Sequence, residues 1–187
     1  MHYTKPSASR LLELMEQHIV ILDGAMGTMI QQHNLTEEDF RGKGFLEKTP
    51  EYLPVSPLQG NNDLLSITRP DVIEDIHLEF LNAGANILET NTFNANRISQ
   101  ADYNLQNKIS EINLAAAQVA RNAADSYGQQ IKLKGLLSDQ PIFIAGSIGP
   151  TNRTCSMSPD VNDPAYRAVT FDYVAQSYRE QAEALIE

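Results

Sequence analysis

Short apolar runs alternate along this chain with longer segments in which apolar and polar residues mix. Three runs, at 19–22, 86–90 and 142–145, carry aliphatic or β-branched side chains at neighbouring positions. A strand that is covered on both faces has this pattern, and each run stops at small or polar residues. The runs therefore predict three buried strands of a parallel sheet.

Apolar residues at helical spacing predict amphipathic helices around these strands. The apolar stripes lie at 8–17, 72–81, 105–123 and 171–186. For the second helix, Thr68 is the expected N-cap, Pro70 fits the first turn and Gly84 fits the C-cap. Strands that alternate with helices indicate an α/β fold with a parallel sheet.

Charge and composition exclude several classes of protein. The chain has 187 residues, 42% of them apolar, with 14 Lys and Arg against 24 Asp and Glu, which gives a formal charge of −10. So acidic a chain is a poor ligand for nucleic acid or an anionic membrane. The apolar run at 19–22 is too short for a signal peptide core or a membrane span. We expect a soluble cytoplasmic protein with neither partner.

The loops and the end of the chain carry further information. The segments after the first and third predicted strands are long and rich in Gly, Pro, Asn and Asp, and such loops are usually functional. The chain stops at Glu187, inside a predicted helix without a C-cap signal. Such a helix normally packs beside a strand that follows, so we expect a piece of a longer protein.

Candidate binding residues follow the first predicted strand. Sites in parallel α/β folds form at the C-terminal ends of strands, and Asp23 stands at such an end. Its carboxylate can bind an ammonium group, while Gly24 and Ala25 let backbone N–H groups approach an anion. The alternative is that Asp23 only caps a short helix over 26–32.

Polar residues also end the second and third predicted strands. Side-chain alternation sends Glu89 and Asn91 to one side and Thr90 and Thr92 to the other, so one pair faces the interior. The alternative is a buried polar network that only fixes the loop. Ser147, in a Gly-rich turn, offers a hydroxyl and neighbouring backbone donors, which is a weak signal.

Other polar residues give little indication of a site. The histidines show no metal-ligand spacing, and these are His2, His18, His33 and His77. His77 lies on a predicted helix and is interpreted as a packed or surface residue. Cys155 is the only cysteine, so it can form neither an internal disulfide nor, by itself, a thiolate metal site, and no His neighbours it in sequence. Asp163 precedes Pro164 and is the expected N-cap of a helix.

Four groups of residues, in this order, resemble the homocysteine-binding domain of S-methyltransferases over about 11–187. They are 21–30, then 60–65 with 69–73, then 83–95, then 146–154 with 158–164. The last group is similar to the cobalamin-dependent methionine synthases and not to the betaine-dependent branch. The resemblance implies a (β/α)8 TIM-type barrel, incomplete here. Residues 1–187 would be its N-terminal part, about three β/α units and the helix before strand four.

The resemblance also implies an activity, which is methyl transfer to the zinc-activated thiol of homocysteine, giving methionine. The donor is methylcobalamin, supplied by methyltetrahydrofolate, and the folate- and cobalamin-binding modules belong to the same full-length chain. The family's three zinc cysteines lie beyond Glu187, and Cys155 matches none of them. We therefore expect this chain alone to bind neither zinc nor methylcobalamin and to be inactive.

The resemblance assigns roles to six residues that end the predicted strands. Asp23 matches the partner of the substrate ammonium group. Gly24, Ala25 and Ser147 match the region that meets the carboxylate. The remaining two, Thr90 and Asn91, match positions in the floor of the pocket.

Two other functions remain open. One is a non-catalytic amino-acid-binding or assembly module built from a half-barrel, and the other is an unrelated barrel enzyme that recognises an amino acid or a phosphate.

A barrel that lacks most of its strands has open edges. We therefore expect incomplete cover of the apolar strand residues Ile21, Ile87, Leu88, Phe143 and Ile144.

Overall fold

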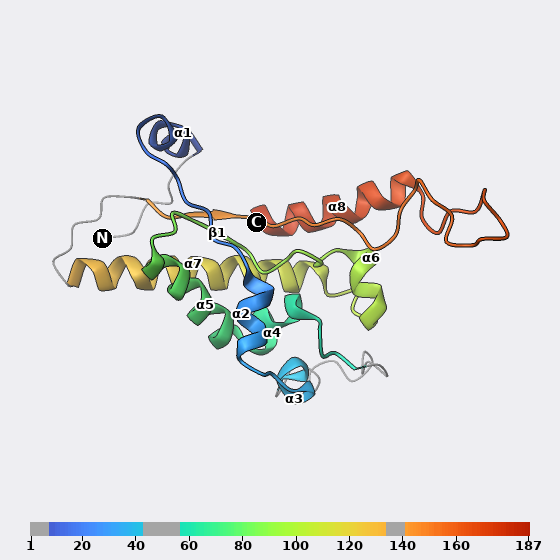
Figure 1. Ribbon diagram of the computed structural model, residues 1–187, viewed down its shortest axis with the longest axis horizontal. Helices are drawn as coiled ribbons and strands as arrows, with labels where there is room; N and C mark the ends of the chain where they lie inside the picture. Colours follow the sequence, from blue (N-terminus) through green and yellow to red (C-terminus); the bar gives the residue numbers. More distant parts are fainter. Residues whose placement is uncertain (1–7, 43–56, 134–140) are drawn as a thin grey trace.

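A short parallel ladder packs against helices in the computed structural model, which describes residues 8–42, 57–133 and 141–187 (Figure 1). The elements are α1 (Ala8–Gln17), α2 (Met26–Gln32), α3 (Glu37–Arg41), η2 (Asn62–Leu64), α4 (Leu65–Thr68), α5 (Pro70–Ala83), β1 (Ile87–Glu89), α6 (Arg97–Gln100), η3 (Ala101–Tyr103), α7 (Ile109–Leu133), β2 (Phe143–Ala145) and α8 (Phe171–Ile186). The predicted α/β class is confirmed, with far more helix than strand.

The ladder places the three predicted strands side by side in chain order. β1 and β2 are parallel, with Leu88 opposite Ile144, and Leu22 forms a single parallel bridge to Ile87. The expectation of full strands at 19–22, 86–90 and 142–145 is therefore wrong in extent. The first strand is reduced to one bridge, beside which the Asn86 amide donates to the Ile21 carbonyl (2.8 Å).

The helices cover one side of this ladder. α7 packs against both α5 and α8 and runs beside α8 along the long axis of the molecule (Figure 1). Leu88 joins a buried cluster with Leu81 of α5 and Ala123 of α7, so the expectation that Leu88 is only partly covered is wrong. Phe143 is buried as well. Ile21 is half exposed, as expected for a strand without a neighbour on its other side.

The ends of α5 differ in part from the prediction. Pro70 is the first residue of the helix and Gly84 ends it with a φ of 105°, both as predicted. Thr68 is not the N-cap, because it is the last residue of α4, where its hydroxyl donates to the Leu64 carbonyl (3.4 Å). Arg69 precedes α5 instead, and its guanidinium pairs with Asp71 in the first turn.

The helix expected after Asp163 begins later. The Asp163 carboxylate accepts hydrogen bonds from the backbone of Ala165 and Tyr166, which closes a turn and not a helix. α8 begins at Phe171, where the apolar stripe starts, and the Thr170 hydroxyl caps it by accepting from the amide of Tyr173.

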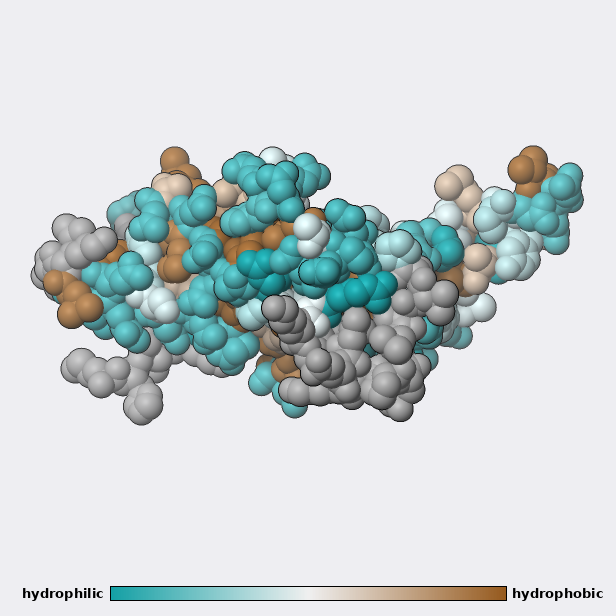
Figure 2. Space-filling view, turned by 90° about the horizontal axis from the view of Figure 1, so that it is seen from below, coloured by the Kyte–Doolittle hydropathy of each residue, from teal (hydrophilic) through white to brown (hydrophobic). Residues whose placement is uncertain are grey.

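The segment between β2 and α8 extends away from the helices as an arm (Figure 1). Its exposed apolar side chains include Met157 and Val161, and hydrophobic colour is visible at the end of the arm in Figure 2. Among the described residues, no helix has the length and apolar content that crossing a membrane requires.

Candidate functional site

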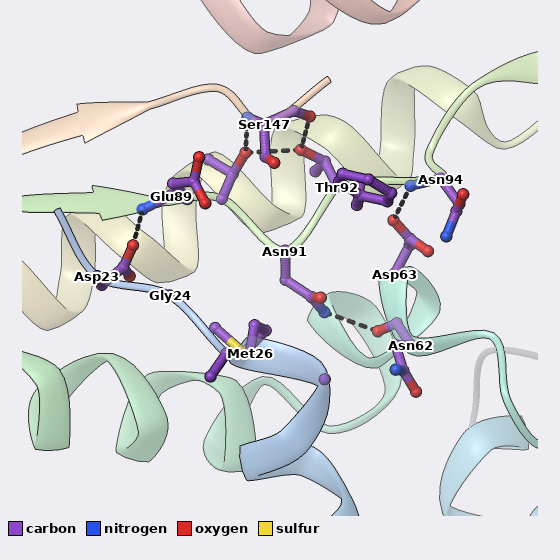
Figure 3. A pocket seen from close by; sticks show the side chains of 14 residues that line it. Asp23, Gly24, Met26, Asn62, Asp63, Glu89, Asn91, Thr92, Asn94 and Ser147 are labelled. Atoms are coloured by element: carbon purple, nitrogen blue, oxygen red, sulfur yellow. Dashed lines mark hydrogen bonds between the residues drawn. The ribbon is translucent and has the colours of Figure 1, made fainter. Parts of the chain in front are cut away.

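A pocket of about 300 Å³ opens at the ends of β1, β2 and the first predicted strand (Figure 3). That first strand is reduced to the Leu22–Ile87 bridge and is called the bridge strand below. Its lining comes from the turn into α2, from η2, from the loop after β1 and from the loop after β2. The lining residues are 23–27, 62–63, 89–94 and Ser147. Because parallel strands end at the same edge, segments far apart in sequence meet here.

The pocket brings together all six residues that the resemblance singled out, namely Asp23, Gly24, Ala25, Thr90, Asn91 and Ser147. Their roles in binding stay predictions. Asp63 was not among the candidates, although it lines the pocket from η2. A single turn of helix has no apolar periodicity to reveal it, and the only signal was that Asp63 lies within the similar segment 60–65.

Asp23 is fixed by the strand and not by the helix that follows it. Its Oδ1 accepts a hydrogen bond from the Glu89 amide at 2.9 Å (Figure 3). The alternative that Asp23 only caps the helix over 26–32 is wrong, because Ala25 holds the N-cap position and no side chain caps α2. The Leu22–Ile87 bridge brings the Asp23 carboxylate to the end of β1, where it faces the pocket.

Threonine hydroxyls join the loops after β1 and β2. The hydroxyls of Thr90 and Thr92 lie 2.6 Å apart. Thr90 Oγ1 accepts from the Ser147 amide (3.0 Å), and Thr92 Oγ1 donates to the Ser147 carbonyl (2.8 Å). Gln181 of α8 donates to the Thr92 carbonyl (2.7 Å). The buried polar network weighed as an alternative therefore exists, and the hydroxyl of Ser147 has no bond to it within the described chain.

Asn91 joins the same loop to η2. Its Nδ2 donates to the Asn62 carbonyl (2.7 Å), which Figure 3 shows across the pocket. The alternation that separates Glu89 and Asn91 from the threonines does not decide what faces the pocket. All four line it because β1 ends at Glu89 and the chain then turns, with the Thr92 amide donating to the Thr90 carbonyl (2.9 Å).

Asp63 is a buried carboxyl in this pocket. Its Oδ1 accepts from the Asn94 amide (2.8 Å), which fixes the loop after β1 against η2. Burial raises the pKa of Asp63 from 3.8 to about 6, and the hydrogen bond from Asn94 only partly opposes this. The pKa of this carboxyl therefore lies well above that of an exposed aspartate.

The pocket is lined by the carboxyl groups of Asp23, Asp63 and Glu89, and its described lining contains no Lys, Arg or His. This charge pattern favours a cationic group such as an ammonium.

Ala25 adopts the left-handed conformation (φ 50°), which is uncommon for a residue with a Cβ. The amides of Gly24 and Ala25 make no hydrogen bond within the described part of the chain, so they remain as donors for an anionic group.

The residues present do not fit the zinc site that the resemblance implies. Three thiolates are required, and the chain has only Cys155, which is exposed on the arm. Within 8–42, 57–133 and 141–187, no three His, Cys, Asp or Glu side chains are grouped so that they could hold a metal ion. His2 lies outside the described residues.

Gly149 allows the close approach of the two loops, and Gly149→Ala is expected to destabilise the protein. An added Cβ would lie 2.5 Å from the Phe93 carbonyl oxygen, to which the Gly149 amide donates. We expect the free energy of unfolding to fall by about 1–3 kcal/mol, as overpacking does. Urea denaturation measures it, with Gly128→Ala in α7 as the control, because no atom lies within 4 Å of that Cβ. Equal stability of Gly149→Ala and the unmodified protein would contradict the contact.

Comparisons with known proteins identify a family and two similar solved structures. The family model for homocysteine S-methyltransferase matches residues 20–187. The solved structure of the homocysteine methyltransferase MmuM from Escherichia coli is similar in its metallated form, with a TM-score of 0.62 and 20% identity over 94% of this chain and 53% of that chain. Its oxidized form gives a TM-score of 0.62 and 19% identity over 94% and 52%. This chain thus spans about half the length of those proteins.

Proposed function

This chain belongs to the homocysteine S-methyltransferase family, and we propose that the pocket at its strand ends binds the amino-acid end of homocysteine during methyl transfer to the thiol. Residues 1–187 are then the N-terminal part of one homocysteine-binding (β/α)8 barrel within a longer enzyme. The parallel order of the bridge strand, β1 and β2 supports this, as does the greater length of the similar structures.

The observation that carries the proposal is the Asp23 carboxylate in a pocket whose described lining holds no cationic side chain. One oxygen of Asp23 is held by the Glu89 amide, which orients the carboxylate. The ammonium group of an amino acid can then form a charge-assisted hydrogen bond to Asp23 without competition from a protein cation.

The carboxylate of homocysteine requires donors, and the pocket offers them without a basic residue. We assign this role to the backbone amides of Gly24 and Ala25 and to the hydroxyl of Ser147. The Ser147 amide is already bonded to Thr90, so Ser147 acts through its hydroxyl. Thr90 and Asn91 form the floor and hold the two loops in place.

The thiol must be activated by groups outside these 187 residues, because Cys155 cannot replace three thiolates. We propose that zinc and methylcobalamin serve the complete enzyme, and that its folate- and cobalamin-binding modules recharge the donor. The similarity of 146–164 to the cobalamin-dependent branch supports this donor. The 187 residues alone are then inactive.

Two assays test the proposal. Isothermal titration of the complete enzyme with homocysteine should give binding, and 4-mercaptobutanoate, which lacks the amino group, should bind about tenfold or more weakly. Methyl transfer from methylcobalamin in the presence of zinc should proceed with the complete enzyme and not with residues 1–187.

Each outcome has a distinct consequence. Equal affinity for the two thiols would contradict the role of Asp23. Turnover by residues 1–187 above the uncatalysed background would contradict the assignment of thiol activation to other residues. Homocysteine binding without turnover by the complete enzyme would favour a non-catalytic amino-acid-binding module.

A further inference from the structure

A histidine lies in the core directly behind the pocket. His77 of α5 is 0% exposed, and neither Nδ1 nor Nε2 has a hydrogen-bond partner among the described residues. Buried polar atoms in native proteins are nearly always paired, because an unpaired one loses its bonds to water without replacement. The apolar stripe of α5 would accept an aliphatic residue at this position, so packing alone does not explain the imidazole.

The charged group that His77 faces is Asp23. His77 Nδ1 lies 3.8 Å from Asp23 Oδ2, and the Asp23 side chain is itself almost fully buried. This distance is too long for a hydrogen bond. The other oxygen of the same carboxylate already accepts from the Glu89 amide at 2.9 Å. The carboxylate is therefore fixed at one oxygen by β1, and its second oxygen faces an unpaired imidazole.

We propose that His77 is a positioning residue for the ammonium site. When the pocket is filled, His77 Nδ1–H donates to Asp23 Oδ2 and fixes the direction in which the carboxylate presents its remaining lone pairs. Hydrogen bonds at functional sites are often long in the unliganded protein and shorten in the complex. His77 does not line the pocket, so it acts only through Asp23.

The chemistry of imidazole suits this role. A neutral imidazole has one N–H donor and can orient a carboxylate without cancelling its charge. A Lys or Arg at the same position would carry a permanent cation next to Asp23 and would compete with the ligand's ammonium group. The inference rests on the proposed function only in taking homocysteine as the source of that ammonium group.

Binding measurements on the complete enzyme test the role of His77. We expect His77→Phe, which keeps a ring of similar size, to raise the homocysteine dissociation constant about tenfold, the value of one hydrogen bond to a charged group. His77→Asn keeps an N–H donor and should recover part of this loss. The affinity for 4-mercaptobutanoate should stay unchanged in both variants, because that ligand has no amino group. His18→Phe, at an exposed position after α1, is the control.

A spectroscopic measurement addresses the contact directly and does not depend on homocysteine as the ligand. In enzyme labelled with ¹⁵N-histidine, the ring nitrogen shifts report which nitrogen carries the proton. We expect Nδ1 to be protonated in the unmodified enzyme and its signal to move in Asp23→Asn. The signal is assigned by its loss in His77→Asn.

These measurements separate the two proposals. An enzyme that binds neither thiol would contradict the proposed function, while the nitrogen shift would still test the contact between His77 and Asp23. An equal loss of affinity for both thiols in His77→Phe, or an unchanged nitrogen shift in Asp23→Asn, would overturn the positioning role. If His77→Phe does not fold, His77→Asn and the nitrogen shift decide.

Discussion

Asp23→Asn is expected to raise the homocysteine KM of the complete enzyme about tenfold to a hundredfold, a loss of roughly 1.5–3 kcal/mol. The variant removes the charge that we propose pairs with the ammonium group of homocysteine. Its Oδ1 can still accept from the Glu89 amide, so the end of β1 keeps its geometry. Steady-state kinetics at saturating methyl donor measure the effect.

Two controls distinguish charge from folding in this experiment. Asp75→Asn changes the same functional group at an exposed position of α5 and should leave the KM unchanged. The metal content of Asp23→Asn should equal that of the unmodified enzyme, because the proposed zinc ligands lie elsewhere. An unchanged KM in Asp23→Asn would make Asp23 a residue of the fold alone.

Asp63→Asn is expected to increase the free energy of unfolding at pH 7 by up to about 3 kcal/mol. The pKa of Asp63 is raised to about 6 in the folded protein, from 3.8, by burial. Between these values the folded state binds more protons than the unfolded state, so this carboxyl lowers stability as the pH rises from 3.8 to 6. Below pH 3.8 both states are protonated, and the variant should gain nothing there. The amide oxygen can still accept from Asn94.

Urea denaturation between pH 4 and pH 7 measures this effect. Asp71→Asn is the matched control with the opposite sign, because hydrogen bonding to Arg69 lowers the pKa of Asp71. That carboxylate adds stability above its unfolded pKa, and this contribution is lost as the pH falls. Asp71→Asn should therefore lower stability at pH 7. The expectation fails if Asp63→Asn keeps the same rise in stability toward acid pH as the unmodified protein.

The helices could be predicted because helical periodicity is a local property of the sequence. The apolar stripes at 8–17 and 171–186 coincide with α1 and α8. Caps are less certain, since several polar residues near a helix start can bind its free amides. Asp163 was the predicted N-cap, but its carboxylate closes a turn, and the N-cap of α8 is Thr170. The one-turn η2 has no periodicity at all, so Asp63 could be found only by comparison with relatives.

The meeting of the strand ends could also be predicted from the sequence. Alternating strands and helices imply a parallel sheet, and its C-terminal ends share one edge, so Asp23, Thr90 and Ser147 gather there. The ordered motifs gave the family, and the match over 20–187 confirms it. The cobalamin-dependent branch remains a proposal. The extent of each strand was not predictable, because strand pairing joins residues far apart in sequence, such as Leu22 with Ile87.

The sequence by itself determined the family, the α/β class and the residues that end each strand, because these depend on local pattern and order along the chain. Only the tertiary structure decided that the Asp23 carboxylate accepts from the Glu89 amide instead of capping α2, and that Asp63 is buried with a raised pKa. It also decided that His77 Nδ1 lies 3.8 Å from Asp23 Oδ2. Burial and distance between residues far apart in sequence arise from packing, and no local pattern encodes them.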